Sequence, residues 1–303
     1  MRFRNPPPPR LKKVQGQGSI TLCSANVTSY NTAVSSWLAA RLGRGTQVFA
    51  IQETHQTETK TKQTQRQLKS WGLEGFYLPA EATGCGGTAG GQFIVAARTV
   101  GASTLASYSL GGNGWCGILL ELAGCKLALF SIYLRTGEGL FGSTNCQLLG
   151  ALRGCLKSLA DGLPWLVVGD WNAEPSALGE SDFLRAVSGA ILDTGEPTYS
   201  TSASALDYAV AHKSLAGLCS IQVTWDVPWR PHAAVVLRIN IGHLPLRGAT
   251  RMCLCCQDLG FLGAVLKLTM YSCALSWSVL ASSCVILNCH KFSADGWPKL
   301  RVG

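Results

Sequence analysis

Between residues 19 and 239, short apolar runs that favour β-strands alternate with longer stretches that favour helices, and this alternation most constrains the fold. The strand-like runs are residues 19–25, 47–51, 92–97, 116–122, 125–133, 166–168, 206–210, 220–225 and 233–239. The helical stretches are residues 32–42, 59–70, 145–160 and 182–188. Because strands outnumber the helices between them, we expect an α/β domain over residues 18–240, with mixed sheets and helices packed outside them.

The charged residues are distributed unevenly along the chain. The formal net charge is +9, which suggests an anionic partner such as nucleic acid. However, residues 18–240 contain 15 basic and 15 acidic residues, so the excess positive charge lies in the two terminal segments. A surface on the central domain that attracts phosphate must therefore come from local clustering of basic residues or from those segments.

The terminal segments differ from the central domain in composition. Residues 1–17 carry five basic residues, no acidic residue and a run of prolines, which is typical of a disordered arm. Residues 241–303 contain six of the 13 cysteines, and residues 261–287 contain one charged residue, Lys267. That stretch is long enough to cross a bilayer, which takes about 20 apolar residues. A membrane helix, a packed helical extension and a segment without an evolved role all stay open for this tail.

The N-terminal charges are not followed by the apolar run of a secretory signal. We therefore expect free thiols and an intracellular location, nuclear or cytoplasmic, with membrane association if residues 261–287 insert. The sequence does not indicate the oligomeric state.

Polar residues suited to phosphate chemistry follow two of the predicted strands. Gly169-Asp170-Trp171-Asn172 comes directly after residues 166–168, and Gln52-Glu53 follows residues 47–51. In an extended segment, Asp170 and Asn172 can point the same way, because the side-chain period of a strand is two. A carboxylate can take a proton from water or bind a hard cation such as Mg²⁺, and an amide can hydrogen-bond a phosphoryl oxygen. Taken alone, each pattern also fits an ordinary turn.

Further candidates occur at other strand ends. Asn26 ends the first strand, and His232 comes just before the last. Asp207 lies within the apolar run 206–210, where a buried acid needs a partner or a metal. In order and spacing, these residues resemble the motifs of the endonuclease/exonuclease/phosphatase superfamily, nearest its apurinic-site endonuclease and retrotransposon endonuclease branch. The resemblance rests on Asn26, Gln52-Glu53, Tyr133, Gly169-Asp170-Trp171-Asn172, Leu206-Asp207-Tyr208 and His232.

The resemblance implies a four-layer α/β/β/α sandwich, with two mixed β-sheets flanked by helices and a site at one edge of the sheets. It implies that Glu53 binds Mg²⁺, or Mn²⁺ in its place, with Asn26 beside the metal. Asp170 would orient or deprotonate the attacking water. The resemblance also implies phosphate binding by Asn172 and His232, and phosphate binding or assistance to the leaving group by Tyr133. Asp207 would position His232 or the phosphate. Arg135, shortly after Tyr133, is a further candidate for phosphate binding.

The sequence departs from the family pattern at the last motif. Where the family has Ser-Asp-His, this chain has Arg230-Pro231-His232, so we expect the carboxylate that orients the histidine to be missing. Asp226, six residues upstream, is a candidate substitute. In serine proteases, where an aspartate has an analogous role, its replacement lowers the rate by about 10⁴-fold.

Three hypotheses about function follow. The first is a Mg²⁺-dependent phosphodiester hydrolase, an endonuclease that acts on nucleic acid, on DNA rather than RNA. The second is a membrane-tethered phosphoesterase that acts on a lipid or small phosphate. The third is a degenerate, non-catalytic domain derived from a retroelement, for which Pro231 is the main support.

Overall fold

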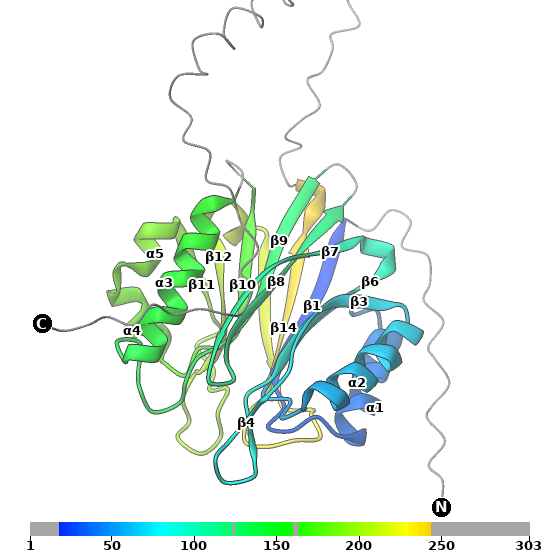
Figure 1. Cartoon of the computed structure of the whole chain (residues 1–303). Coiled ribbons are helices and arrows are strands. Elements are labelled where there is room, and N and C mark those ends of the chain that lie inside the picture. The colour runs from blue at the N-terminus through cyan, green and yellow to red at the C-terminus, as the bar shows by residue number, and fades with distance from the viewer. Residues whose placement is uncertain (1–17, 123–124, 160–162, 244–303) are drawn as a thin grey trace, which may run out of the picture. The chain divides into compact units, whose positions relative to one another are not determined.

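In a computed structural model of the chain, residues 18–122, 125–159 and 163–243 form two six-stranded mixed β-sheets with helices on their outer faces (Figure 1). The first sheet has the order β13-β14-β1-β2-β6-β3 and the second has the order β11-β12-β10-β9-β8-β7. A small hairpin, β4 paired with β5, follows β3. The predicted 1–17 arm and 244–303, which hold most of the tail, lie outside the described residues.

The strands and helices follow one another along the chain as predicted, with additions. The strands of the first sheet are β1 (Ser19–Asn26), β2 (Val48–Gln52), β3 (Leu73–Leu78), β6 (Gln92–Ala97), β13 (Cys219–Thr224) and β14 (Ala234–Asn240). Those of the second are β7 (Ala102–Leu110), β8 (Asn113–Leu122), β9 (Cys125–Tyr133), β10 (Trp165–Asp170), β11 (Gly189–Leu192) and β12 (Asp207–His212). The hairpin strands are β4 (Glu81–Ala82) and β5 (Thr88–Ala89). The helices are α1 (Thr32–Gly43), α2 (Glu58–Ser70), α3 (Ser143–Ser158), α4 (Pro175–Glu180), α5 (Asp182–Val187) and α6 (Lys213–Ala216), with 3₁₀ turns η1 (Arg98–Val100) and η2 (Ile241–His243).

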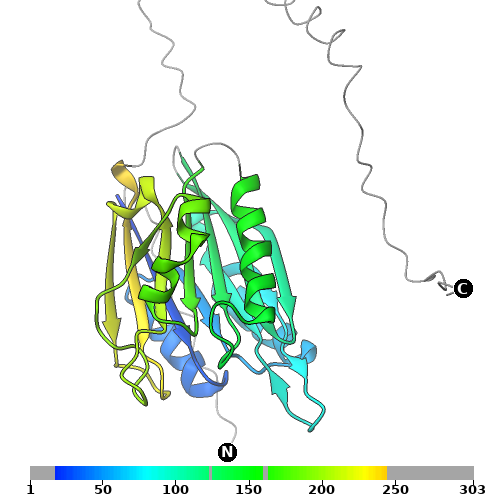
Figure 2. The same ribbon diagram turned by 90° about the vertical axis from the view of Figure 1, so that its left-hand side faces the viewer.

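Three apolar layers hold the sheets and helices together. The central layer lies between the sheets, where Leu22 and Val48 of the first sheet pack with Leu166 and Val168 of the second. Helices α1 and α2 cover the outer face of the first sheet, and α3, α4 and α5 cover that of the second (Figures 1 and 2). Apolar side chains fill the space between each sheet and its helices. Because a central strand is buried on both faces, most of its positions are apolar, which is why these strands were predictable. The expected four-layer α/β/β/α sandwich is confirmed.

Three strands that the sequence did not predict, β3, β7 and β11, are edge strands of the two sheets. An edge strand buries less of its surface, so its sequence need not be continuously apolar. β7, with the sequence Ala-Ser-Thr-Leu-Ala-Ser-Tyr-Ser-Leu, has no fully buried residue. The missing signal is therefore a consequence of position in the sheet.

Among the described residues, no helix has the length and apolar character needed to cross a bilayer. The stretch 261–287, which the sequence left open as a membrane helix, lies outside them.

Candidate functional site

The predicted site residues meet because the register of the two sheets brings their strand ends to one edge. Asn26, the last residue of β1, pairs with Gln52, the last residue of β2. In the other sheet, Asp170 at the end of β10 pairs with Tyr133 of β9 and with Asp207 of β12. His232 lies two residues before Ala234, which pairs with Ala25 near the same end of β1.

The Asp170 carboxylate links the two sheets. Its Oδ2 accepts a hydrogen bond of 2.8 Å from Asn26 Nδ2, and its Oδ1 accepts one of 2.9 Å from the backbone N–H of Asn172. The side chain is buried, which raises its pKa to about 7, and the negative charge of Asp207 acts in the same direction. A carboxylate whose pKa lies near neutral pH is suited to accept a proton from water.

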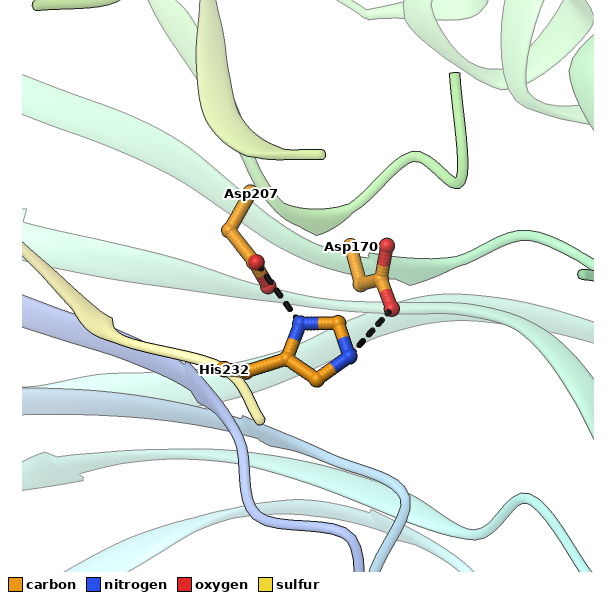
Figure 3. Close-up of side chains that lie close together, drawn as sticks. All are labelled: Asp170, Asp207 and His232. Carbon is orange, nitrogen blue, oxygen red and sulfur yellow. Dashed lines mark hydrogen bonds and ion pairs between the residues drawn. The ribbon is translucent and has the colours of Figure 1, made fainter. Parts of the chain in front are cut away.

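His232 lies between two carboxylates (Figure 3). Its Nδ1 is 2.9 Å from Asp207 Oδ2, and its Nε2 is 4.0 Å from Asp170 Oδ2. Burial lowers the pKa of this imidazole, but the hydrogen bond and charge of Asp207, with the charge of Asp170, outweigh it and raise the pKa to about 9. The ring of Tyr199 covers the imidazole at a centroid distance of 4.8 Å. At neutral pH, His232 is therefore a cation that Asp207 holds in place.

The Gly-Asp-Trp-Asn sequence shapes the end of β10. Gly169 has φ +148°, and a Cβ at this position would lie 2.0 Å from the carbonyl oxygen of Ile132, so only glycine lets β10 approach β9 here. Trp171 is fully buried and stacks on Tyr208 at 5.3 Å. β10 ends at Asp170, so the expectation that Asp170 and Asn172 share one face of an extended strand is wrong.

Asn172 instead adopts φ +46°, and its side chain is engaged with the loop that follows β9. Its Nδ2 donates to the carbonyl of Leu134 at 2.7 Å, and its Oδ1 accepts from Thr136 Oγ1 at 3.1 Å. Among the described residues, the second hydrogen of this amide makes no hydrogen bond. Arg135, in the same loop, is paired with Glu138 at 3.2 Å, and its side chain is 56% exposed.

The Glu53 side chain is held by Tyr133. Tyr133 Oη donates a hydrogen bond of 2.6 Å to Glu53 Oε1, and the Glu53 side chain is 21% exposed. Burial and the nearby Glu53 carboxylate raise the pKa of Tyr133, so its hydroxyl stays protonated. Glu53 itself has φ +55°, a conformation uncommon outside glycine.

Two groups of residues could hold a divalent cation. Asp170, Asp207 and His232 offer ligand atoms that all lie within 4.8 Å of one another. In that cluster, however, Asp207 and His232 are already joined by a buried hydrogen bond. Among the described residues, Glu53 Oε2 makes no hydrogen bond, and Asn26 lies at the end of the neighbouring strand. Because Mg²⁺ prefers oxygen ligands, Glu53 offers the freer carboxylate oxygen for such a cation, whereas Asn26 Oδ1 already accepts from the backbone N–H of Thr28.

Comparison with solved structures identifies the fold. The endonuclease domain of TRAS1, a telomere-specific non-LTR retrotransposon, superposes with a TM-score of 0.56 at 16% identity, covering 74% of this chain and 99% of its own. The 3′ phosphatase NExo from Neisseria, bound to product DNA hairpin, gives 0.55 at 12% identity, covering 73% and 99%. The AP endonuclease LMAP from Leishmania major gives 0.54 at 12% identity, covering 73% and 88%. The chain has the DNase I-like fold of the endonuclease/exonuclease/phosphatase superfamily.

Sequence comparison alone does not detect this relationship. No protein-family model matches the chain, and the curated proteins contain no match. The resemblance predicted from the motifs is nevertheless confirmed at the level of the DNase I-like fold.

The DNase I-like domain supplies the contact that the sequence suggested was missing. The expectation that His232 lacks an orienting carboxylate because Pro231 replaces an aspartate is wrong, since Asp207 makes that contact. Among the described residues, the carboxylates paired with His232 are those of Asp207 and Asp170, not that of Asp226, the suggested substitute. Asp207, 25 positions before His232, is the residue that the family resemblance implied would position His232 or the phosphate.

Several residues that shape this site were not singled out from the sequence. Thr198 is buried, and its Oγ1 accepts from the backbone N–H groups of Leu206 and Asp207 at 3.0 and 2.9 Å. Asn145 of α3 is buried and fixes the loop after β9 through three hydrogen bonds, to Arg135 N, Arg135 O and Gly139 O. Asn145 carries a detectable signal, because it is a polar residue in the apolar row of α3 that continues through Leu148 and Leu152.

Gln52, the neighbour of Glu53, helps to link the two sheets. Its Nε2 donates to Ser131 Oγ at 2.8 Å, and Ser131 Oγ donates in turn to Gln92 Oε1 at 2.9 Å. All three side chains are buried. This chain of hydrogen bonds joins β2 and β6 of the first sheet to β9 of the second, beneath the site.

Proposed function

We propose that this protein is a divalent-metal-dependent phosphodiesterase that cleaves nucleic acid internally. The observation that carries the proposal is the arrangement of Asp170, whose pKa is raised to about 7, with its Oδ2 4.0 Å from Nε2 of the protonated His232. A proton acceptor and a cationic hydrogen-bond donor thus face the same space. Phosphoryl transfer needs this combination, because catalysis of this reaction consists largely of positioning and charge stabilisation.

The residues can be assigned to steps of the hydrolysis. Asp170 accepts a proton as a water oxygen attacks phosphorus, and the bond from phosphorus to the leaving sugar oxygen breaks as that oxygen takes up a proton from solvent water. His232 Nε2–H and the free amide hydrogen of Asn172 donate to the phosphoryl oxygens as negative charge builds on them. Asp207 keeps His232 oriented and charged. A divalent cation, Mg²⁺ or Mn²⁺, held by Glu53 with Asn26 beside it, would supply Lewis-acid stabilisation of the negative oxygens. Tyr133 fixes Glu53.

The substrate class is supported by the fold neighbours. A retrotransposon endonuclease, an AP endonuclease and a phosphatase bound to product DNA are among the proteins with this fold. We therefore take DNA as the first substrate to test, ahead of RNA. The contact between Asp207 and His232 counts against a degenerate, non-catalytic domain, because it restores the feature on which that hypothesis rested.

Plasmid nicking tests the proposal. The full-length chain is incubated with supercoiled plasmid that contains some abasic sites, in Mg²⁺ or in EDTA, beside the variants Asp170→Asn and Asp182→Asn. Asp182 is exposed and paired with Arg185, so its variant is the control. We expect Mg²⁺-dependent nicking that falls by roughly 10²–10⁴-fold in Asp170→Asn and is unchanged in Asp182→Asn. A folded wild-type protein that does not nick the plasmid would refute the nuclease assignment.

A further inference from the structure

The loop between β13 and β14, residues 225–233, carries an exposed aromatic ring and an exposed cation next to His232. Trp225 is 36% exposed, and the guanidinium carbon of Arg230 lies 5.8 Å from the centroid of its ring. Arg230 Nη1 also donates to the carbonyls of Trp229 at 2.7 Å and Val227 at 3.2 Å. These contacts hold the guanidinium through Nη1, and among the described residues its other N–H groups make no hydrogen bond.

This loop is anchored to the protein on its inner side. Trp229 is buried and packs edge-on against Trp37 of α1 at a centroid distance of 4.9 Å. Trp37 Nε1 also donates to the carbonyl of Asp226 at 2.9 Å. Trp225 lies in this anchored loop, and its side chain is nevertheless exposed. Loose packing of the loop therefore does not explain its exposure.

Hydrogen bonds connect the loop to the candidate site. Thr28 Oγ1 donates to the carbonyl of Arg230 at 3.1 Å, and the backbone N–H of Thr28 donates to Asn26 Oδ1 at 3.0 Å. Asn26 in turn donates to Asp170. An unbroken path of contacts therefore runs from Arg230 to Asp170. Arg230 is also two residues from His232 in sequence, so its backbone lies beside the same site.

The site is rich in carboxyl groups, so a cation beside it would help to bind a nucleic-acid strand. Glu53, Asp170 and Asp207 place three carboxyl groups at the site, and carboxylates repel a polyanionic strand. Arg135, the candidate phosphate ligand from the sequence, is paired with Glu138. Arg230, by contrast, has no ion pair among the described residues, and guanidinium geometry suits phosphate.

We propose that Arg230 and Trp225 form a platform that holds the nucleic-acid strand beside the scissile phosphate. Arg230 binds a neighbouring phosphodiester, and an unpaired base stacks on the exposed indole of Trp225, because aromatic rings at such positions stack bases regardless of sequence. This inference rests on the proposed function and adds a substrate class to it. The preferred strand is single-stranded, or locally unpaired next to the cleaved bond.

Binding in EDTA tests the platform without any need for cleavage. Fluorescence anisotropy measures the Kd of the full-length chain for a labelled single-stranded 20-mer and for its duplex at several salt concentrations. We expect Arg230→Gln to weaken binding by roughly 5- to 20-fold and to reduce the slope of log Kd against log salt by about 1. Trp225→Ala should weaken single-strand binding by roughly 5- to 50-fold with little change in that slope, and Trp225→Phe should restore most of it.

Arg44→Gln is the matched control. Arg44 is exposed and lies between the end of α1 and the start of β2. The start of β2 is at the opposite end of the strands from Gln52 and Asp170. Its variant should bind within about twofold of the wild type, since it lies off the proposed path of the strand. Arg230→Lys, which keeps the charge but loses the planar fork, should bind with intermediate affinity.

The outcomes separate this inference from the proposed function. Wild-type nicking with unaltered binding by Arg230→Gln would overturn the platform and leave the nuclease in place. Absence of nicking, together with the expected loss of binding, would leave the platform standing and overturn the catalytic proposal. Equal losses in Arg44→Gln and Arg230→Gln, a preference for duplex, or Arg230-dependent binding to phosphatidylserine vesicles instead of DNA would each contradict the platform.

Discussion

Asp207 Oδ2 lies 2.9 Å from His232 Nδ1, and this buried hydrogen bond fixes which ring nitrogen of the imidazole points toward Asp170. Because Nδ1 is occupied, Nε2 is the nitrogen left to meet a ligand. The pair comes from β12 and from the loop before β14, so it also ties the two sheets together at the edge where their strands end. Its loss should therefore affect both stability and chemistry.

The pH dependence of stability should report this pair. The pKa of His232 is raised from 6.5 to about 9 in the folded protein, so the folded state binds the proton more tightly than the unfolded state. The resulting stabilisation is complete below about pH 6.5 and is lost as the pH rises through about 9. We expect the free energy of unfolding, measured with urea in EDTA, to fall by about 1–3 kcal/mol between pH 7.5 and 9.5.

The Asp207→Asn variant provides the comparison. Its uncharged amide does not raise the pKa of His232, so the loss of stability between these two pH values should be smaller than in the wild type. Asp182→Asn, at an exposed carboxylate, should behave as the wild type does. A wild-type protein whose stability is flat or rises over this range would contradict a protonated His232.

A second prediction concerns the cation. Saturating Mg²⁺ or Mn²⁺ should stabilise the fold, by about 2.7 kcal/mol when the concentration is 100 times Kd, and should raise Tm accordingly. Glu53→Gln should remove most of this effect, whereas Glu58→Gln, at an exposed residue of α2 paired with Lys62, should not. Tyr133→Phe leaves Glu53 without its hydrogen-bond donor and should weaken the affinity by roughly tenfold or more. If Glu53→Gln keeps the full Tm shift and Asp207→Asn abolishes it, the cation binds in the Asp170, Asp207 and His232 cluster instead.

What the sequence could predict was set by how local each signal is. The central strands and the polar residues at their ends were predictable, because both the apolar run and the polar end occur within a few consecutive residues, as in β2 and β10. The contact of Asp207 with His232 followed only from the family resemblance, because the two residues are 25 positions apart and come from β12 and from the loop before β14. Asp226 is nearer in sequence, but the carboxylates that the structure pairs with His232 are those of Asp207 and Asp170. Edge strands such as β7 and the loop contacts of Asn145 also depend on tertiary packing.

Asn145 should act as a positioning residue through the loop after β9. In Asn145→Ala, the backbone groups of Arg135 and Gly139 lose three hydrogen bonds, so we expect a loss of about 2 kcal/mol in the free energy of unfolding. The same loop presents the Leu134 carbonyl and Thr136 hydroxyl to Asn172, so kcat for nicking should fall by roughly tenfold, with a smaller change in KM. Gln147→Ala, at an exposed position on the same helix, is the control. Equal effects in the two variants would rule out this role.

The last prediction contrasts two glycines that differ in what surrounds them. In Gly169→Ala, the new Cβ meets the Ile132 carbonyl oxygen 2.0 Å away, and φ is +148°, which alanine rarely adopts. Relief of that contact must separate β10 from β9 next to Asp170, so we expect a loss of at least about 3 kcal/mol in the free energy of unfolding. Gly154, inside α3, has open space within 4 Å of the point where a Cβ would lie, so Gly154→Ala should instead stabilise the protein by about 0.5–1 kcal/mol. Urea unfolding of both variants checks this, and a Gly169→Ala protein as stable as the wild type would show that the strand approach does not require glycine.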